Sequence, residues 1–199
     1  RRNGPTMSDK SASSVGYELT DAFTTPSTAS IYYGADGYFV AANSLLGYPF
    51  RILHNTSVGG ETIAQINARI PSAMAKYRPA YAVYMAGTND VQDSGVNSIA
   101  TADAAAAAAI AGIQAGWDAI LSYGATVLTY TVPPRTSLNG FQRRVWAQVN
   151  SWIRSNVSRG KYGRVYLAGD AAKAAGNPAT GDWLTSGQYG AVASANSGD

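Results

Sequence analysis

Apolar and polar residues alternate along the chain in blocks that predict strands and helices in turn. Short runs rich in Val, Tyr, Leu and Ile, bounded by Gly, Pro or Asn, are typical of buried strands. We expect strands at residues 14–19, 50–55, 80–86, 125–132 and 164–168. Longer segments with apolar residues three or four positions apart predict helices at 36–46, 61–77, 101–122 and 139–158. This alternation predicts an α/β fold whose parallel sheet is covered by helices on both faces.

The composition favours one globular domain. The 199 residues are 46% hydrophobic and 14% charged, which excludes a highly charged, disordered chain. We expect a polar tail at 1–13 and a single domain over 14–199. The sequence has no cysteine, so disulfides and thiolate chemistry are excluded. We expect no membrane segment. We also expect no nucleic-acid partner, because the basic residues near Arg143 and Arg144 read as the solvated face of an amphipathic helix.

The most informative motif is Gly87-Thr88-Asn89-Asp90, directly after the strand predicted at 80–86. Ligands of open α/β proteins collect at the carboxyl ends of strands, and an Asn amide there can donate to a developing oxyanion. A second segment, Val58-Gly59-Gly60-Glu61-Thr62, follows the strand predicted at 50–55. The alternative for both is local: Gly60 supplies a positive φ and Asn89 caps a turn.

Together these segments resemble the SGNH (GDSL) hydrolase family, over roughly residues 14–170. The resemblance implies a three-layer, flavodoxin-like α/β/α sandwich with a five-stranded parallel sheet. It implies ester hydrolysis through a serine nucleophile, with Gly60 and Asn89 at the positions that donate to the oxyanion. It implies no cofactor. The acidic residues Asp90, Asp93 and Asp103 lack the spacing of a metal site, so no metal is expected.

The rest of the catalytic set departs from the family pattern. The best match to Gly-Asp-Ser is Thr20-Asp21-Ala22, where Thr replaces Gly and Ala22 occupies the nucleophile position without a hydroxyl to acylate. Two segments match the family's Asp-x-x-His. In the first, Asp182 is followed by Thr185 in place of His. In the second, Asp199 begins the motif and the chain stops before the His, leaving the domain without its final helix.

Three further residues are candidates for ligand binding: Asp90, Arg135 and His54. Arg135 follows the strand predicted at 125–132 and would contact an anionic or polyol ligand at the same edge, although a surface turn explains it at least equally well. His54 is the single histidine and lies close to Ser57 in the chain. Because two side chains of one short loop rarely form a nucleophile and its base, we expect a structural role for His54.

These departures predict a degenerate SGNH-hydrolase-like domain that is non-catalytic. It would bind a glycan or acylated polysaccharide, form a homo-oligomer, or assemble into a larger particle such as a phage virion fibre. One alternative is an active serine esterase or carbohydrate deacetylase, in which Ala22 substitutes the nucleophile and the His lies beyond Asp199 or on another chain. The other alternative is a purely structural component. An extracellular or virion-associated location is favoured over a cytoplasmic one.

Overall fold

The computed structural model describes residues 47, 49, 53–135 and 138–172. The chain divides into two compact units, Arg1–Gly60 and Glu61–Asp199, and most described residues belong to the second. The tail at 1–13, the strand predicted at 14–19 and the helix predicted at 36–46 lie outside the described residues. One domain over 14–199 therefore stays a prediction.

Three parallel strands form the sheet of the second unit. β1 (Tyr81–Tyr84), β2 (Thr126–Tyr130) and β3 (Val165–Gly169) lie in the order β1-β2-β3, with Val83, Leu128 and Tyr166 aligned across them. Each overlaps a predicted strand. The strand predicted at 50–55 is wrong in its described part, because residues 53–58 have no regular structure. A strand needs ladder partners, and the pairings within the described residues join only β1, β2 and β3.

Three long helices connect and cover these strands. α3 (Ile63–Tyr77) precedes β1, α5 (Ile99–Ser122) connects β1 to β2, and α6 (Gly140–Asn156) connects β2 to β3. Each begins at a capping box, formed by Thr62, Ser98 or Asn139 with the residue three positions later. These predicted helices are confirmed, and α3 contains Pro71 in its interior. The short helices α4 (Thr88–Val91) and η3 (Gly160–Tyr162) were not predicted, because they are too short to show a helical period of apolar residues.

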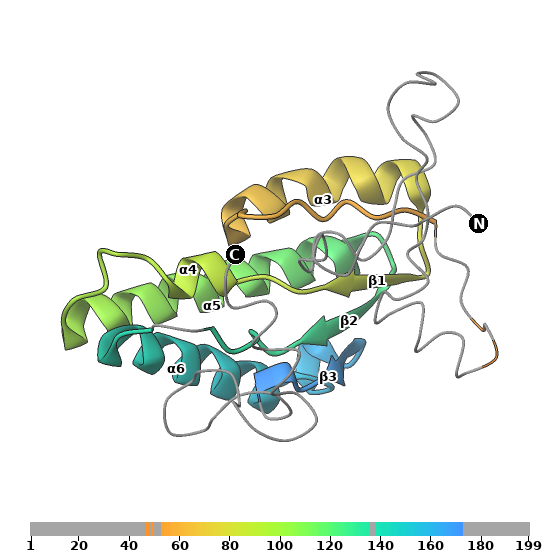
Figure 1. The fold of residues 1–199 in the computed structure, drawn as a ribbon. Coiled ribbons are helices and arrows are strands. Elements are labelled where there is room, and N and C mark those ends of the chain that lie inside the picture. Colours follow the sequence, from red (N-terminus) through yellow and green to blue (C-terminus); the bar gives the residue numbers. More distant parts are fainter. Residues whose placement is uncertain (1–46, 48, 50–52, 136–137, 173–199) are drawn as a thin grey trace, which may run out of the picture. The chain divides into compact units, whose positions relative to one another are not determined.

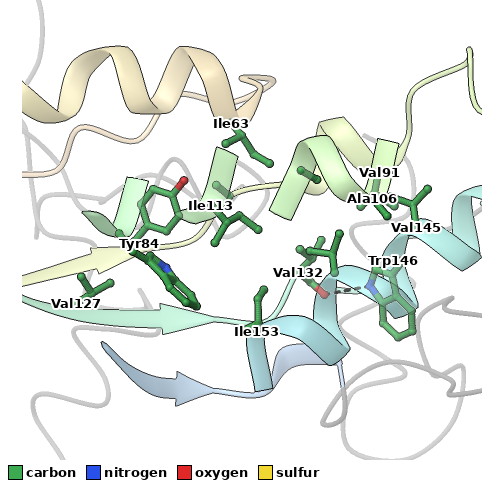
Figure 2. Packing of buried hydrophobic residues seen from close by; sticks show 14 of the residues in the cluster. Ile63, Tyr84, Val91, Ala106, Ile113, Val127, Val132, Val145, Trp146 and Ile153 are labelled. Atoms are coloured by element: carbon green, nitrogen blue, oxygen red, sulfur yellow. Dashed lines mark hydrogen bonds between the residues drawn. The ribbon is translucent and has the colours of Figure 1, made fainter. Parts of the chain in front are cut away.

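The helices pack side by side over one face of the sheet, with α5 between α3 and α6 (Figure 1). Right-handed crossovers between parallel neighbours place α5 and α6 on the same face. The apolar core lies between the two layers, where Figure 2 shows Ile113 of α5, Val127 of β2 and Ile153 of α6. On the opposite face of the sheet, Tyr81 and Tyr166 are about half exposed.

Two glycines of α5 allow α3 to approach closely. A Cβ on Gly112 would lie 2.6 Å from Cγ2 of Ile63, and a Cβ on Gly116 would lie 2.6 Å from the hydroxyl oxygen of Tyr84. Asn67 of α3 fills this contact. Its Nδ2 donates to the Gly112 carbonyl at 2.7 Å, and its Oδ1 accepts from the Tyr84 hydroxyl at 2.9 Å. The contact fixes the start of α3 relative to the end of β1.

By length and composition, α5 is apolar enough to span a membrane, with a hydropathy of 1.4 over an 18-residue window. Core helices of soluble proteins meet the same criterion. In this fold Ile113, Trp117 and Ile120 of α5 are buried against the neighbouring elements, as expected for the central helix of an α/β layer. The expectation of no membrane segment stays a prediction.

Candidate functional site

A glycine turn places Asn89 and Asp90 at the carboxyl end of β1. The chain leaves β1 after Tyr84 and turns at Gly87, whose φ of 110° is open to glycine and strained for other residues. A Cβ on Gly87 would also lie 3.1 Å from Cγ2 of Val132. α4 starts immediately after this turn and carries both polar residues. The predicted Gly-x-Asn-Asp loop is thus a tight strand-to-helix connection.

Asn89 bridges two segments that are distant in sequence. Its Nδ2 donates to the Glu61 carbonyl at 2.9 Å, and its Oδ1 accepts from Nη1 of Arg135 at 3.3 Å. A carbonyl oxygen only accepts and a guanidinium only donates, so these partners permit a single orientation of the amide. Because Nδ2 carries two hydrogens and the Glu61 carbonyl takes one, the second N–H makes no hydrogen bond to a described residue.

Asp90 connects the same turn to the start of α3. Both carboxylate oxygens of Asp90 accept from the backbone amide of Ile63, at 3.0 and 3.3 Å. Burial raises the pKa of Asp90 above its ordinary value, and the hydrogen bond from Ile63 opposes that rise. The carboxylate also lies at the positive end of the α3 dipole. Asp90 therefore has a structural task, which the sequence did not indicate.

Glu61 and Arg69 form an ion pair beside Asn89. Nη1 of Arg69, on the second turn of α3, donates to Oε1 of Glu61, whose side chain is 16% exposed. The other carboxylate oxygen, Oε2, is buried and has no hydrogen-bond partner among the residues that the structure describes. The same residue, Glu61, accepts from Asn89 through its backbone carbonyl. Sequence reasoning missed it, since a Glu and an Arg eight residues apart make no recognised motif.

Arg135 comes from the loop that leaves β2, and α6 anchors that loop. Asn150 of α6 is fully buried and bonds both ways to Val132: Oδ1 accepts from its amide at 2.7 Å and Nδ2 donates to its carbonyl at 3.1 Å. Nε1 of Trp146 donates to the same carbonyl at 3.0 Å, the dashed contact in Figure 2. The half-buried Arg135 is thereby held three residues from a rigid anchor.

A second polar cluster stands at the carboxyl end of β3. Asp170 accepts from the Thr131 hydroxyl at 3.0 Å and from Nε and Nη2 of Arg154 at 2.7 and 2.8 Å. The Asp170 side chain is 22% exposed, and both of its oxygens are engaged. The cluster joins β2, β3 and α6, so we assign it to the fold.

The structure thus brings together Asn89, Asp90 and Arg135 of the predicted site. Gly60 belongs to the other unit, where its φ is 81°. His54 lies in the irregular segment 53–58, in which the Ser57 amide donates to Oδ1 of Asn55 at 3.0 Å. The remaining candidates, Asp21, Ala22, Asp182 and Asp199, lie outside the described residues.

The described part of the chain contains no candidate metal site. Within residues 53–135 and 138–172, His, Asp and Glu side chains do not gather in a group of three that could hold an ion. Glu61, Asp90 and Asp170 are instead engaged by Arg69, by the Ile63 amide and by Arg154. These carboxylates serve the fold.

Comparison with known proteins identifies the class. The sequence model of the GDSL-like Lipase/Acylhydrolase family matches residues 19–187, most of the chain. The chain therefore belongs to this family and has its three-layer α/β/α fold, of which the described residues form the parallel sheet and one helical layer. No curated protein and no solved structure is significantly similar to the chain.

Proposed function

We propose that this chain is a degenerate, non-catalytic member of the GDSL-like family that binds a glycan at the carboxyl edge of its sheet. Support comes first from the chemistry missing at matching positions. Ala22 has no hydroxyl to form an acyl-enzyme, and Thr185 follows Asp182 where the family places its base. The family match ends at residue 187, so it includes Asp182 and leaves out Asp199.

The proposal rests mainly on the hydrogen bonds that the Asn89 side chain makes. Its amide is oriented by Glu61 and Arg135, and one N–H has no acceptor among the described residues and is open to a ligand there. A side chain needed only to cap a turn would satisfy its own loop. Asn89 instead cross-links two distant segments and keeps a directed donor. A binding surface around Asn89 and Arg135 needs neither nucleophile nor base. Asp21 and Gly60 are assigned to it from the sequence alone.

The test is labelling with a fluorophosphonate probe, followed by peptide mass spectrometry. We expect no serine to be modified while an active family member, treated in parallel, is labelled at its nucleophile. One serine modified in stoichiometric amount would overturn the non-catalytic proposal, and Ser57 is the first to inspect. Binding is tested on the same preparation with a panel of acylated and non-acylated glycans, where Asn89→Ala should weaken any binding at the proposed surface.

The rival is an active serine esterase or carbohydrate deacetylase. The retained Asn89 donor favours it, since such donors stabilise the tetrahedral oxyanion of acyl transfer. In that case Ala22 replaces a serine, and the histidine lies beyond Asp199 or comes from another chain. An Ala22→Ser variant extended past Asp199 with its native downstream sequence should then hydrolyse acetylated glycans. Failure of that variant would remove the rival.

Assembly into a larger particle, such as a virion fibre, makes no demand on Asn89. A purely structural component should therefore keep its partner when Asn89 is changed to Ala. A glycan-binding domain should instead lose affinity. Measuring partner binding of this one variant separates the two readings.

A further inference from the structure

Asn89, its sequence neighbour and its hydrogen-bond partners connect four charged side chains, Glu61, Arg69, Asp90 and Arg135, and three of these four are engaged. Glu61 pairs with Arg69. Asp90 accepts twice from the Ile63 amide at the positive end of α3. Arg135 is different, because among the described residues its guanidinium has no carboxylate partner. Its one hydrogen bond to a described residue goes to the neutral Oδ1 of Asn89.

The geometry leaves one edge of Arg135 open. Nη1 is committed to Asn89, whereas Nε and Nη2 make no hydrogen bond to a described residue. The Nε and Nη2 hydrogens point the same way and match the two oxygens of a carboxylate. The remaining N–H of Asn89 is a third donor on the adjacent side chain. Both side chains are held in place, one by Glu61 and the other through the loop that α6 anchors.

We propose that Arg135 and Asn89 bind the carboxylate of an acidic sugar, so that the glycan recognised by this domain contains uronic acid units. This rests on the proposed function and names its ligand class. In the part of the chain that the structure describes, Arg135 is half-buried and has no counter-charge, and such a cation carries a desolvation cost that neutral hydroxyl groups offset only in part. A carboxylate on the open edge of Arg135 supplies the missing charge and two charge-assisted hydrogen bonds.

The experiment measures binding of a galacturonic acid trisaccharide and of its carboxyl-reduced counterpart by calorimetry, with the full chain. Variants are Arg135→Met, Arg135→Lys and, as a matched control, Arg159→Met. Arg159 is exposed, and its replacement by Met changes the net charge by the same amount as Arg135→Met does. We expect the wild type to favour the acidic trisaccharide by at least about tenfold. Arg135→Met should abolish that preference, Arg135→Lys should keep part of it, and Arg159→Met should keep it all. Unfolding curves of each variant identify any loss of fold.

Each other outcome counts against the inference. Equal losses in Arg135→Met and Arg159→Met would show unspecific attraction to a basic protein. Equal binding of the acidic and reduced trisaccharides by the wild type, weakened by Asn89→Ala, would overturn the carboxylate site and leave glycan binding standing. If the protein bound neither trisaccharide but did bind a different neutral glycan, the carboxylate site would again be overturned and glycan binding would stand. Binding of no glycan at all would overturn both proposals.

Discussion

At the residue scale, Asn89 and Asp90 are neighbours with different tasks. One N–H of Asn89 makes no hydrogen bond to a described residue and is the donor that the proposed function uses, whereas both oxygens of Asp90 accept from the Ile63 amide. From the sequence, both residues are predicted to lie at the carboxyl end of a strand, and both are candidates for ligand binding. Only the fold separates them, because α3 begins next to the turn that carries them. Changing Asp90 should therefore alter stability before it alters binding.

Asp90→Asn should raise stability at neutral pH. Burial raises the folded-state pKa of Asp90 above its ordinary value, so the ionised form is the disfavoured one in the fold. A raised carboxyl pKa contributes stability at low pH, and that contribution is lost as pH rises through the folded pKa. Asn mimics the protonated acid and keeps an acceptor for Ile63. The variant should thus unfold at higher urea concentration than the wild type at pH 7, and the gap should close as pH falls below the ordinary pKa of an aspartate.

A control with the opposite sign is available in Asp103. The hydrogen bond from Arg144 lowers the pKa of Asp103, so its carboxylate adds stability above the ordinary pKa and loses it in acid. Asp103→Asn should therefore be no more stable than the wild type at pH 7. If both variants moved in the same direction, or if the effect of Asp90→Asn did not depend on pH, burial of the Asp90 charge would not be the cause.

At the element scale, the contact between α3 and α5 depends on glycine. Gly116→Ala would bring a Cβ within 2.6 Å of the Tyr84 hydroxyl oxygen and 2.7 Å of Oδ1 of Asn67. To make room, the hydrogen bond between these two side chains must break or the helices must separate. We expect a loss of about 1–3 kcal/mol in the free energy of unfolding, which is typical of overpacking. Urea denaturation followed by circular dichroism measures it.

Gly140→Ala is the matched control for that substitution. Gly140 is the first residue of α6, and a Cβ added to it would meet nothing within 4 Å. Alanine is the better helix former, so this variant should be as stable as the wild type or more stable by up to about 1 kcal/mol. Equal stability of the two alanine variants would mean that α3 and α5 have room to spare, contrary to the close approach at Gly116.

Most of the helices and strands in the described residues could be predicted from sequence patterns. Strands β1, β2 and β3 and helices α3, α5 and α6 could be predicted, because each buries apolar residues at a regular period. The segment 53–55 could not, because an apolar run signals burial without saying what pairs with it. The sequence predicts that Asn89 and Arg135 follow separate strands, and the structure joins the two side chains by a hydrogen bond. Their connection through the Glu61 carbonyl was not predictable, since backbone acceptors leave no trace in the sequence.

At the scale of the whole molecule, the catalytic parts of this family come from separate segments of the chain. Under the proposed function, Gly60 and Asn89 are the retained oxyanion positions, Ala22 stands at the nucleophile position, and the base position is Thr185 or lies beyond Asp199. Each part therefore can be lost or restored without the others. The hydrogen bonds that orient Asn89 come from Glu61 and Arg135, so the proposed binding surface does not depend on a nucleophile or a base.

Restoring both missing groups should therefore return activity. The double variant with Ala22→Ser and Thr185→His should hydrolyse p-nitrophenyl acetate at least about 100-fold faster than either single variant, since nucleophile and base act as a unit. Adding Asn89→Ala should then lower the rate by about 100-fold, the usual loss of one oxyanion donor. Moving the histidine one residue along, in Ser186→His with Ala22→Ser, should give no gain. A double variant as inert as the single ones would contradict the assignment of Thr185 to the base position and favour the alternative in which the base lies beyond Asp199.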